Sequence, residues 1–145
     1  MFRRGRRFFS AASIGLLFVA LAHTLGNWST TPNNDAEAAV IRAMSGYTLA
    51  MGAGMAPSFW DIFRGLTFTM SIAMVLSGVQ NLLAAKYGSD QLIRALAIVN
   101  IVCVGALTVL YWVYRVPPPL FTFALVTVLF ALSLLGKSAN EGGSK

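Results

Sequence analysis

Charged residues are scarce in this sequence. Of 145 residues, 11 are Lys or Arg and 5 are Asp or Glu, so 11% of the chain is charged and 57% is hydrophobic. Soluble domains usually carry about 25% charged residues. This deficit, together with a mean hydropathy of +0.69, argues against an ordinary soluble domain and for a chain whose solvent is a lipid bilayer.

Cysteine and histidine are scarcer still, with one residue of each. Cys103 alone cannot form an intramolecular disulfide or a cysteine-based metal cluster. A single histidine, His23, excludes a zinc site built on several histidines and a bis-histidine haem within one chain. Phosphate-binding loops, nucleophile elbows, zinc-protease helices and dinucleotide fingerprints are also missing. We therefore expect no metal and no cofactor.

What the sequence has instead is four long apolar blocks. They predict helices over residues of about 8–26, 59–85, 92–114 and 119–136. Helices of roughly 17–27 residues can cross about 30 Å of hydrocarbon, and they satisfy their own backbone hydrogen bonds there. The predicted fold class is all-α: an integral membrane four-helix bundle that forms a single transmembrane domain over residues 1–145.

The segments between the blocks differ in kind. Residues 86–91, KYGSDQ, predict a tight polar turn, and RVPPP at 115–119 breaks the helical pattern because proline cannot continue a helix. The first outer loop, residues 27–58, is longer. Within it, Asn34 or Asp35 can cap a short helix that we expect to lie at the membrane interface. Its apolar face comprises Val40, Ile41 and Met44.

The basic residues predict how the chain is oriented. With a cytoplasmic N-terminus, the inner side holds Arg3, Arg4, Arg6, Arg7, Lys86, Arg94, Lys137 and Lys145, and the outer side holds Arg42, Arg64 and Arg115. The excess on the inner side predicts a multi-pass protein of the cell inner membrane with both termini in the cytoplasm. Trp28, Trp60 and Trp112 then all lie near the outer interface, where amphipathic rings are expected.

The basic N-terminus also bears on partners and processing. RRGRR, residues 3–7, directly precedes an apolar run, so it indicates membrane topology and not nucleic-acid binding, despite the net charge of +6. The same region, followed by Ala20-Leu21-Ala22, also fits a cleaved signal sequence. We favour a retained helix because the apolar character continues to Leu25 and this helix completes the bundle. Cleavage would leave three spans.

Three ionisable side chains are predicted to share one depth on the outer side. His23 lies near the outer end of the first span, and Asp61 and Arg64 lie near the outer end of the second. Such a set can relay protons, bind an anionic headgroup or hold a polar substrate, which makes these three the candidate catalytic residues. Candidate ligand contacts are Trp28, Trp60, Asn81, Asn100 and Arg115.

A structural interpretation of the same residues is favoured. Ser58-x-x-Asp61 fits a capping box, with Arg64 at i+3 as an ion-pair partner. His23 is then an interhelical hydrogen-bonding residue. Side-chain amides such as Asn81 and Asn100 usually join helices inside membranes. Met44, Met51, Met55, Met70 and Met74 could with His23 suggest copper(I), but methionine is more often adaptable packing.

One stretch also carries a resemblance. Residues 59–85 open with Trp60-Asp61-Ile62-Phe63-Arg64-Gly65, and the first span ends near His23-Thr24. In these features the chain resembles a family of small bacterial four-helix membrane proteins of unassigned function, and its layout is similar to DoxX-like proteins. The resemblance implies four helices and a bacterial membrane, and it implies no activity.

Three functions remain open from the sequence. The favoured one is a small non-enzymatic membrane protein whose partners are the lipid bilayer and, through helix contacts, further copies of itself or a membrane protein. The alternative is an enzyme or binder that acts on a lipidic small molecule through His23, Asp61 and Arg64. A small transporter is the least favoured, because the first span carries no membrane-embedded carboxylate.

Overall fold

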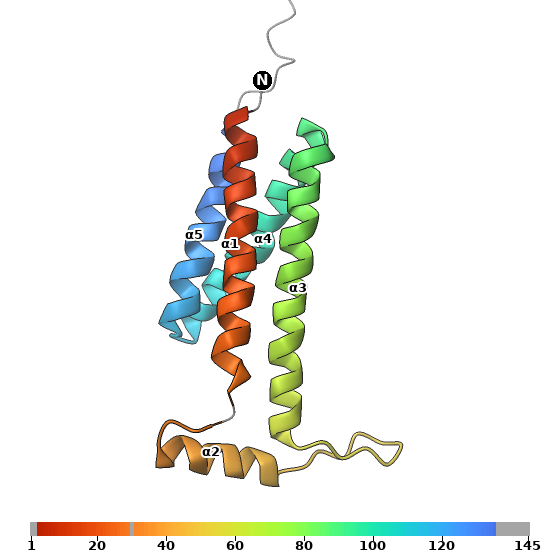
Figure 1. The fold of residues 1–145 in the computed structure, drawn as a ribbon, viewed down its shortest axis with the longest axis vertical. Helices are drawn as coiled ribbons and strands as arrows, with labels where there is room; N and C mark the ends of the chain where they lie inside the picture. Colours follow the sequence, from red (N-terminus) through yellow and green to blue (C-terminus); the bar gives the residue numbers. More distant parts are fainter. Residues whose placement is uncertain (1–2, 30, 136–145) are drawn as a thin grey trace, which may run out of the picture. The chain divides into compact units, whose positions relative to one another are not determined.

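Five α-helices follow one another along the chain in a computed structural model that describes residues 3–29 and 31–135 (Figure 1). They are α1 (Arg3–Trp28), α2 (Asp35–Gly46), α3 (Phe59–Tyr87), α4 (Asp90–Val113) and α5 (Pro117–Ser133). Of the described residues 82% are helical, and these residues contain no strand, only an isolated antiparallel bridge between Thr48 and Ser58. The all-α prediction is confirmed.

The helix ends differ from the expected ones at two prominent places. α1 begins at Arg3 and not near residue 8, so the basic residues are part of the helix. α5 begins at Pro117 and not at residue 119, because a helix tolerates proline in its first turn, where backbone N–H groups lack intrahelical acceptors. The expected end at residue 136 lies outside the described residues, as do Lys137 and Lys145.

Three helices are long and apolar enough to cross a membrane. These segments are Arg4–Trp28 in α1, Phe59–Tyr87 in α3 and Asp90–Val113 in α4. α5 is apolar but shorter, with 17 residues. The expectation of several membrane-spanning helices is therefore supported by length and composition for three of the four predicted spans.

The contacts within the chain divide it into two compact units. The terminal unit comprises Met1–Val19 and Met74–Lys145, and the central unit comprises Ala20–Ala73. The terminal unit therefore holds the beginning of α1, the end of α3, and all of α4 and α5. The central unit holds the end of α1, all of α2 and the beginning of α3.

The core of the terminal unit is built mainly from aromatic and aliphatic side chains. Phe9 in α1 and Phe130 in α5 pack edge to face with ring centroids 5.5 Å apart. Glycines allow close approach elsewhere: a Cβ at Gly78 would lie 2.7 Å from Leu17 Cδ2 and 3.1 Å from the Ser13 carbonyl oxygen. Other buried apolar residues of this unit are Ala12, Leu16, Val19, Met74, Ile93, Ala97, Val104, Phe123 and Val126.

Arg6 fastens the beginning of α1 to the turn between α3 and α4. Its guanidinium donates to Asp90 Oδ1 at 2.9 and 3.0 Å and to the carbonyl oxygens of Ala85 and Gly88 at 2.8 Å each. The turn itself is fixed by Ser89, whose Oγ accepts a hydrogen bond from Leu92 N at 3.1 Å. One arginine therefore satisfies carbonyl groups that the end of α3 cannot satisfy itself.

The central unit begins its own short helix with a cap that the sequence predicted. Asn34 Oδ1 accepts a hydrogen bond from Glu37 N at 2.8 Å, and α2 follows from Asp35 to Gly46. Residues 47–58 then form a hairpin-like loop. Its two ends are joined by hydrogen bonds from Leu49 N to the Pro57 oxygen and from Phe59 N to the Tyr47 oxygen. This loop leads directly into α3.

Candidate functional site

The beginning of α3 is a complete capping box. Ser58 Oγ accepts a hydrogen bond from Asp61 N at 3.1 Å, and Asp61 Oδ2 accepts from Ser58 N at 3.1 Å and from Ser58 Oγ at 2.6 Å. Each side chain thereby satisfies a backbone N–H group that has no partner inside the helix. The predicted cap is confirmed, and among the described residues the Asp61 carboxylate accepts hydrogen bonds only from Ser58.

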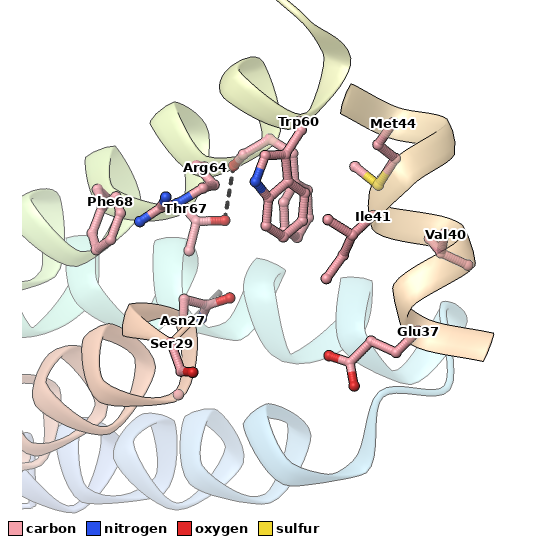
Figure 2. A pocket seen from close by; sticks show the side chains of 12 residues that line it. Asn27, Ser29, Glu37, Val40, Ile41, Met44, Trp60, Arg64, Thr67 and Phe68 are labelled. Carbon is pink, nitrogen blue, oxygen red and sulfur yellow. Dashed lines mark hydrogen bonds between the residues drawn. The ribbon is translucent and has the colours of Figure 1, made fainter. Parts of the chain in front are cut away.

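Arg64 does not pair with Asp61, although the spacing suggested an ion pair. Its guanidinium carbon lies 5.6 Å from the ring centroid of Phe68, one turn further along α3. Among the described residues no hydrogen bond or ion pair engages the Arg64 guanidinium. The physical reason is direction. The Asp61 side chain turns back toward Ser58, to which it is hydrogen-bonded. The Arg64 side chain instead extends along the helix toward Phe68, as Figure 2 shows.

Arg64 is part of the wall of a cavity of about 310 Å³ in the central unit (Figure 2). Three segments supply that wall: the end of α1, one face of α2, and the first turns of α3. The lining residues are Gly26, Asn27, Ser29, Glu37, Val40, Ile41, Met44, Trp60, Phe63, Arg64, Thr67 and Phe68. The volume is at the lower end of the range of small-molecule sites, about 300–1,000 Å³.

The α2 side of the cavity follows from helical spacing. Glu37, Ile41 and Met44 recur at i, i+4 and i+7, which places them on one face of the helix. Figure 2 shows Ile41 and Met44 on the side of α2 toward Trp60. Glu37 is already engaged, because its Oε2 accepts hydrogen bonds from Asn33 N at 2.8 Å and Asn33 Nδ2 at 2.9 Å. This face is therefore mainly apolar.

Aromatic rings stiffen the α3 side. Trp60 and Phe63 are stacked with centroids 5.7 Å apart, and Phe68 packs edge to face against Trp28 at 6.3 Å. Thr67 turns its hydroxyl to the Phe63 carbonyl oxygen at 2.9 Å. Rings held in this way present a preformed surface, so a ligand would lose little side-chain entropy from the protein.

His23 is separate from this arrangement. Its Nε2 atom is buried and has no hydrogen-bond partner among the described residues, and His23 does not line the cavity. Among the described residues no hydrogen bond joins His23 to Asp61 or Arg64. Of the three candidate catalytic residues, only Arg64 therefore lies in the cavity wall.

The remaining candidate ligand contacts fall into different places. Trp60 lines the cavity, and Trp28 reaches it only through its contact with Phe68. Asn81 and Asn100 are buried in the terminal unit and bond to each other, with Nδ2···Oδ1 distances of 3.1 and 3.2 Å. They act as the helix-joining pair that the sequence favoured. Arg115 lies at the turn between α4 and α5 in the terminal unit.

Metal ligands do not gather in the described part of the chain. No group of three or more His, Cys, Asp or Glu side chains forms there. Of the methionines considered for copper, Met44 lines the cavity, Met51 and Met55 are exposed, and Met74 is buried in the terminal unit. The chemistry available in the cavity is thus one guanidinium, one engaged carboxylate, small polar groups and aromatic rings.

Comparisons of the chain with protein-family models, with curated proteins and with solved structures found no match.

Local sequence signals pointed to parts of the cavity but not to the cavity itself. The apolar face of α2 was visible in the spacing of Val40, Ile41 and Met44, and Trp60 and Arg64 were already candidates. Asn27, Phe63, Thr67 and Phe68 were missed as lining residues. For the α3 residues the signal was the i, i+3, i+4, i+7 and i+8 spacing of Trp60, Phe63, Arg64, Thr67 and Phe68 on one face of that helix, whereas no pattern pointed to Asn27.

Proposed function

We propose that this is an integral membrane protein whose four long apolar helices, α1, α3, α4 and α5, all cross a bilayer. α4 supports the proposal strongly, because only 17% of its most apolar stretch of 18 residues is buried within the protein. Exposed Ile98, Val99, Val102 and Val109 on this helix need an apolar solvent. At about 1.5 Å per residue, the 17 residues of α5 reach roughly 25 Å, which suits a short span.

The proposed location is the cell inner membrane, with both termini in the cytoplasm. Support comes from the basic residues. Arg6 is hydrogen-bonded to the turn between α3 and α4, and Lys86 and Arg94 flank this turn in the sequence. Those cations therefore share one end of the terminal unit, as the positive-inside rule expects for the cytoplasmic side. In this orientation α2 and the cavity lie on the outer side.

We propose that the cavity binds the polar end of an amphipathic small molecule. The single observation that carries this proposal is the Arg64 guanidinium, which has no ion-pair partner among the described residues yet lines a cavity with aromatic and apolar walls. Such a cation favours an anionic group, and the walls favour the apolar part of the same ligand. About 310 Å³ is the volume of roughly ten waters, so the cavity accommodates a headgroup and not a whole phospholipid.

Binding without catalysis is the form of this function that the geometry favours. A general acid or base needs a proton-handling group within hydrogen-bond reach of the ligand. Asp61 is engaged with Ser58, the Glu37 carboxylate is engaged with Asn33, and His23 does not line the cavity. A purely partner-interacting role is the outcome if no molecule occupies the site.

Native mass spectrometry of the purified full-length protein tests the binding proposal. We expect a small amphiphile to copurify with the natural chain and to be lost from two variants, Arg64→Leu and Ile41→Trp, the second of which fills the cavity. Arg42→Leu is the matched control, because Arg42 is an exposed arginine of α2 that does not line the cavity. Equal occupancy in all four proteins, or an empty natural protein, would refute the proposal.

A further inference from the structure

The turn between α4 and α5 is a complete Schellman motif. Val116 N donates to the Tyr111 carbonyl oxygen at 3.0 Å, and Arg115 N donates to the Trp112 carbonyl oxygen at 3.2 Å. These are the 6→1 and 5→2 hydrogen bonds that close a helix end, and proline follows directly, as is common after this motif. The motif assigns Arg115 to the C′ position, the first residue beyond the helix cap.

Arginine is the wrong residue for this position on backbone grounds. The C′ residue adopts a left-handed conformation, which favours glycine or asparagine because other side chains crowd the following carbonyl group. Arg115 has φ of 54°, and the only other non-glycine residue with positive φ in the described ranges is Ala53. Residues held in such backbone conformations cluster at functional sites, so Arg115 is a candidate for one.

Arg115 lines a cavity that has exposed aromatic side chains. A cavity of about 360 Å³ is lined by Trp112, Arg115, Pro117, Leu120 and Phe121. Trp112 and Phe121 are each 71% exposed. Within the described residues no carboxylate pairs with Arg115 and no hydrogen bond engages its side chain. The first turn of α5 consists of three prolines, so it offers no N–H donors, and the guanidinium carries the local positive charge.

We propose that this cavity binds a net-anionic membrane phospholipid, with its phosphate on Arg115 and its chain against Trp112, Leu120 and Phe121. The inference rests on the proposed membrane location but not on the ligand of the Arg64 cavity. Charge complementarity selects an anionic headgroup, and the apolar walls select a lipid over free phosphate, because a single exposed arginine in water holds a small anion weakly.

The test uses the full chain in nanodiscs of phosphatidylcholine with a minor fraction of phosphatidylglycerol, and counts retained lipids by native mass spectrometry. We expect the natural protein to retain phosphatidylglycerol in roughly five-fold excess over its bulk fraction, the effect of one cation near the surface. Arg115→Gly and Arg115→Asn should lose this enrichment, whereas Arg42→Ala, which removes another outer arginine, should keep it.

Folding is controlled in the same experiment. Because glycine and asparagine suit positive φ, both Arg115 variants should melt in pure phosphatidylcholine at least as high as the natural protein. Enrichment that survives in Arg115→Gly would overturn the proposal, as would its removal by millimolar inorganic phosphate, which would indicate a free-anion site. Loss of enrichment in Arg42→Ala as well would reveal a general charge effect and also overturn it. Failure here leaves the Arg64 result unaffected, since the two cavities share no residue.

Discussion

Asp61 and Ser58 act together, since each satisfies the backbone of the other at the start of α3. Replacing Ser58 with alanine removes the N-cap, and we expect the free energy of unfolding to fall by about 1 kcal/mol. Asp61→Asn should also destabilise, because an amide is a weaker acceptor than a carboxylate. Thermal unfolding in detergent measures both.

The same two variants separate a cap from a catalytic group. If Asp61 only caps α3, the amphiphile bound at the Arg64 cavity should copurify with Ser58→Ala and Asp61→Asn as it does with the natural protein. A stable Asp61→Asn protein that had lost this molecule would show that the carboxylate has a second role.

Asn100 makes one hydrogen bond more than Asn81, so we expect replacing the two residues to lower stability by different amounts. Asn100 Nδ2 also donates to the Leu96 carbonyl oxygen at 2.7 Å, so Asn100 keeps one hydrogen bond if its partner is lost. Asn81 would keep neither bond to Asn100. We therefore expect Asn100→Leu to lower stability more than Asn81→Leu, within a range of about 1–3 kcal/mol for buried unsatisfied groups.

A double-mutant cycle tests that pair directly. The variant with both leucines should be more stable than the sum of the single effects predicts, because neither polar group is then left without a partner. Unfolding in mixed micelles gives the four free energies. Additive effects would mean that the two amides do not interact in the native protein.

At the scale of elements, two glycines on α3 differ sharply in surroundings. A Cβ at Gly78 would meet Leu17 and the Ser13 backbone of α1, whereas a Cβ at Gly65 would meet nothing within 4 Å. Gly78→Ala should lower the free energy of unfolding by about 1–3 kcal/mol through overpacking, although alanine is the better helix former. Gly65→Ala is the matched control and should be neutral or stabilising by up to about 1 kcal/mol. Equal effects would argue against close packing of α1 and α3 at Gly78.

Elements whose signal lies within a few residues were predictable from the sequence. Ser58-x-x-Asp61 announced the start of α3, and Asn34 announced the start of α2, because a cap depends on neighbours three residues away. The end of α4 was foreseen only as a break at the prolines. Its Schellman motif was not, since the usual signal is glycine and the chain has Arg115 in that position.

Contacts between distant segments were beyond reach. The shared depth of His23, Asp61 and Arg64 suggested one site, but depth does not determine which way a side chain points around its helix. Asp61 turns to Ser58, Arg64 turns to Phe68, and His23 lines no part of the cavity. Of the three, only Arg64 lines the cavity that the end of α1, α2 and the start of α3 form together, and no local pattern encodes how these segments meet.

For the whole molecule, the proposed topology predicts which surfaces reagents can reach. Cys103 is the only cysteine, so Cys103→Ser provides a background for single reporters. We expect a membrane-impermeant maleimide added to spheroplasts to label Ser45→Cys on α2 but not Gln91→Cys at the start of α4; both native residues are exposed. Permeabilised cells should show both labelled. Labelling of Gln91→Cys in intact spheroplasts would reverse the assigned orientation.

Arg6 has a consequence for the order in which the protein is made. Its acceptors at Ala85, Gly88 and Asp90 lie 79–84 residues further along the chain. At about 5–20 residues per second, the ribosome reaches them roughly 4–17 s after it has made Arg6. During that interval the acceptors of the Arg6 guanidinium have not yet been made, so α1 lacks the hydrogen bonds that join it to the turn between α3 and α4. Synthesis of the turn between α3 and α4 supplies these acceptors. A chain that stalls before residue 85 therefore has α1 without any of the hydrogen bonds from Arg6 to this turn.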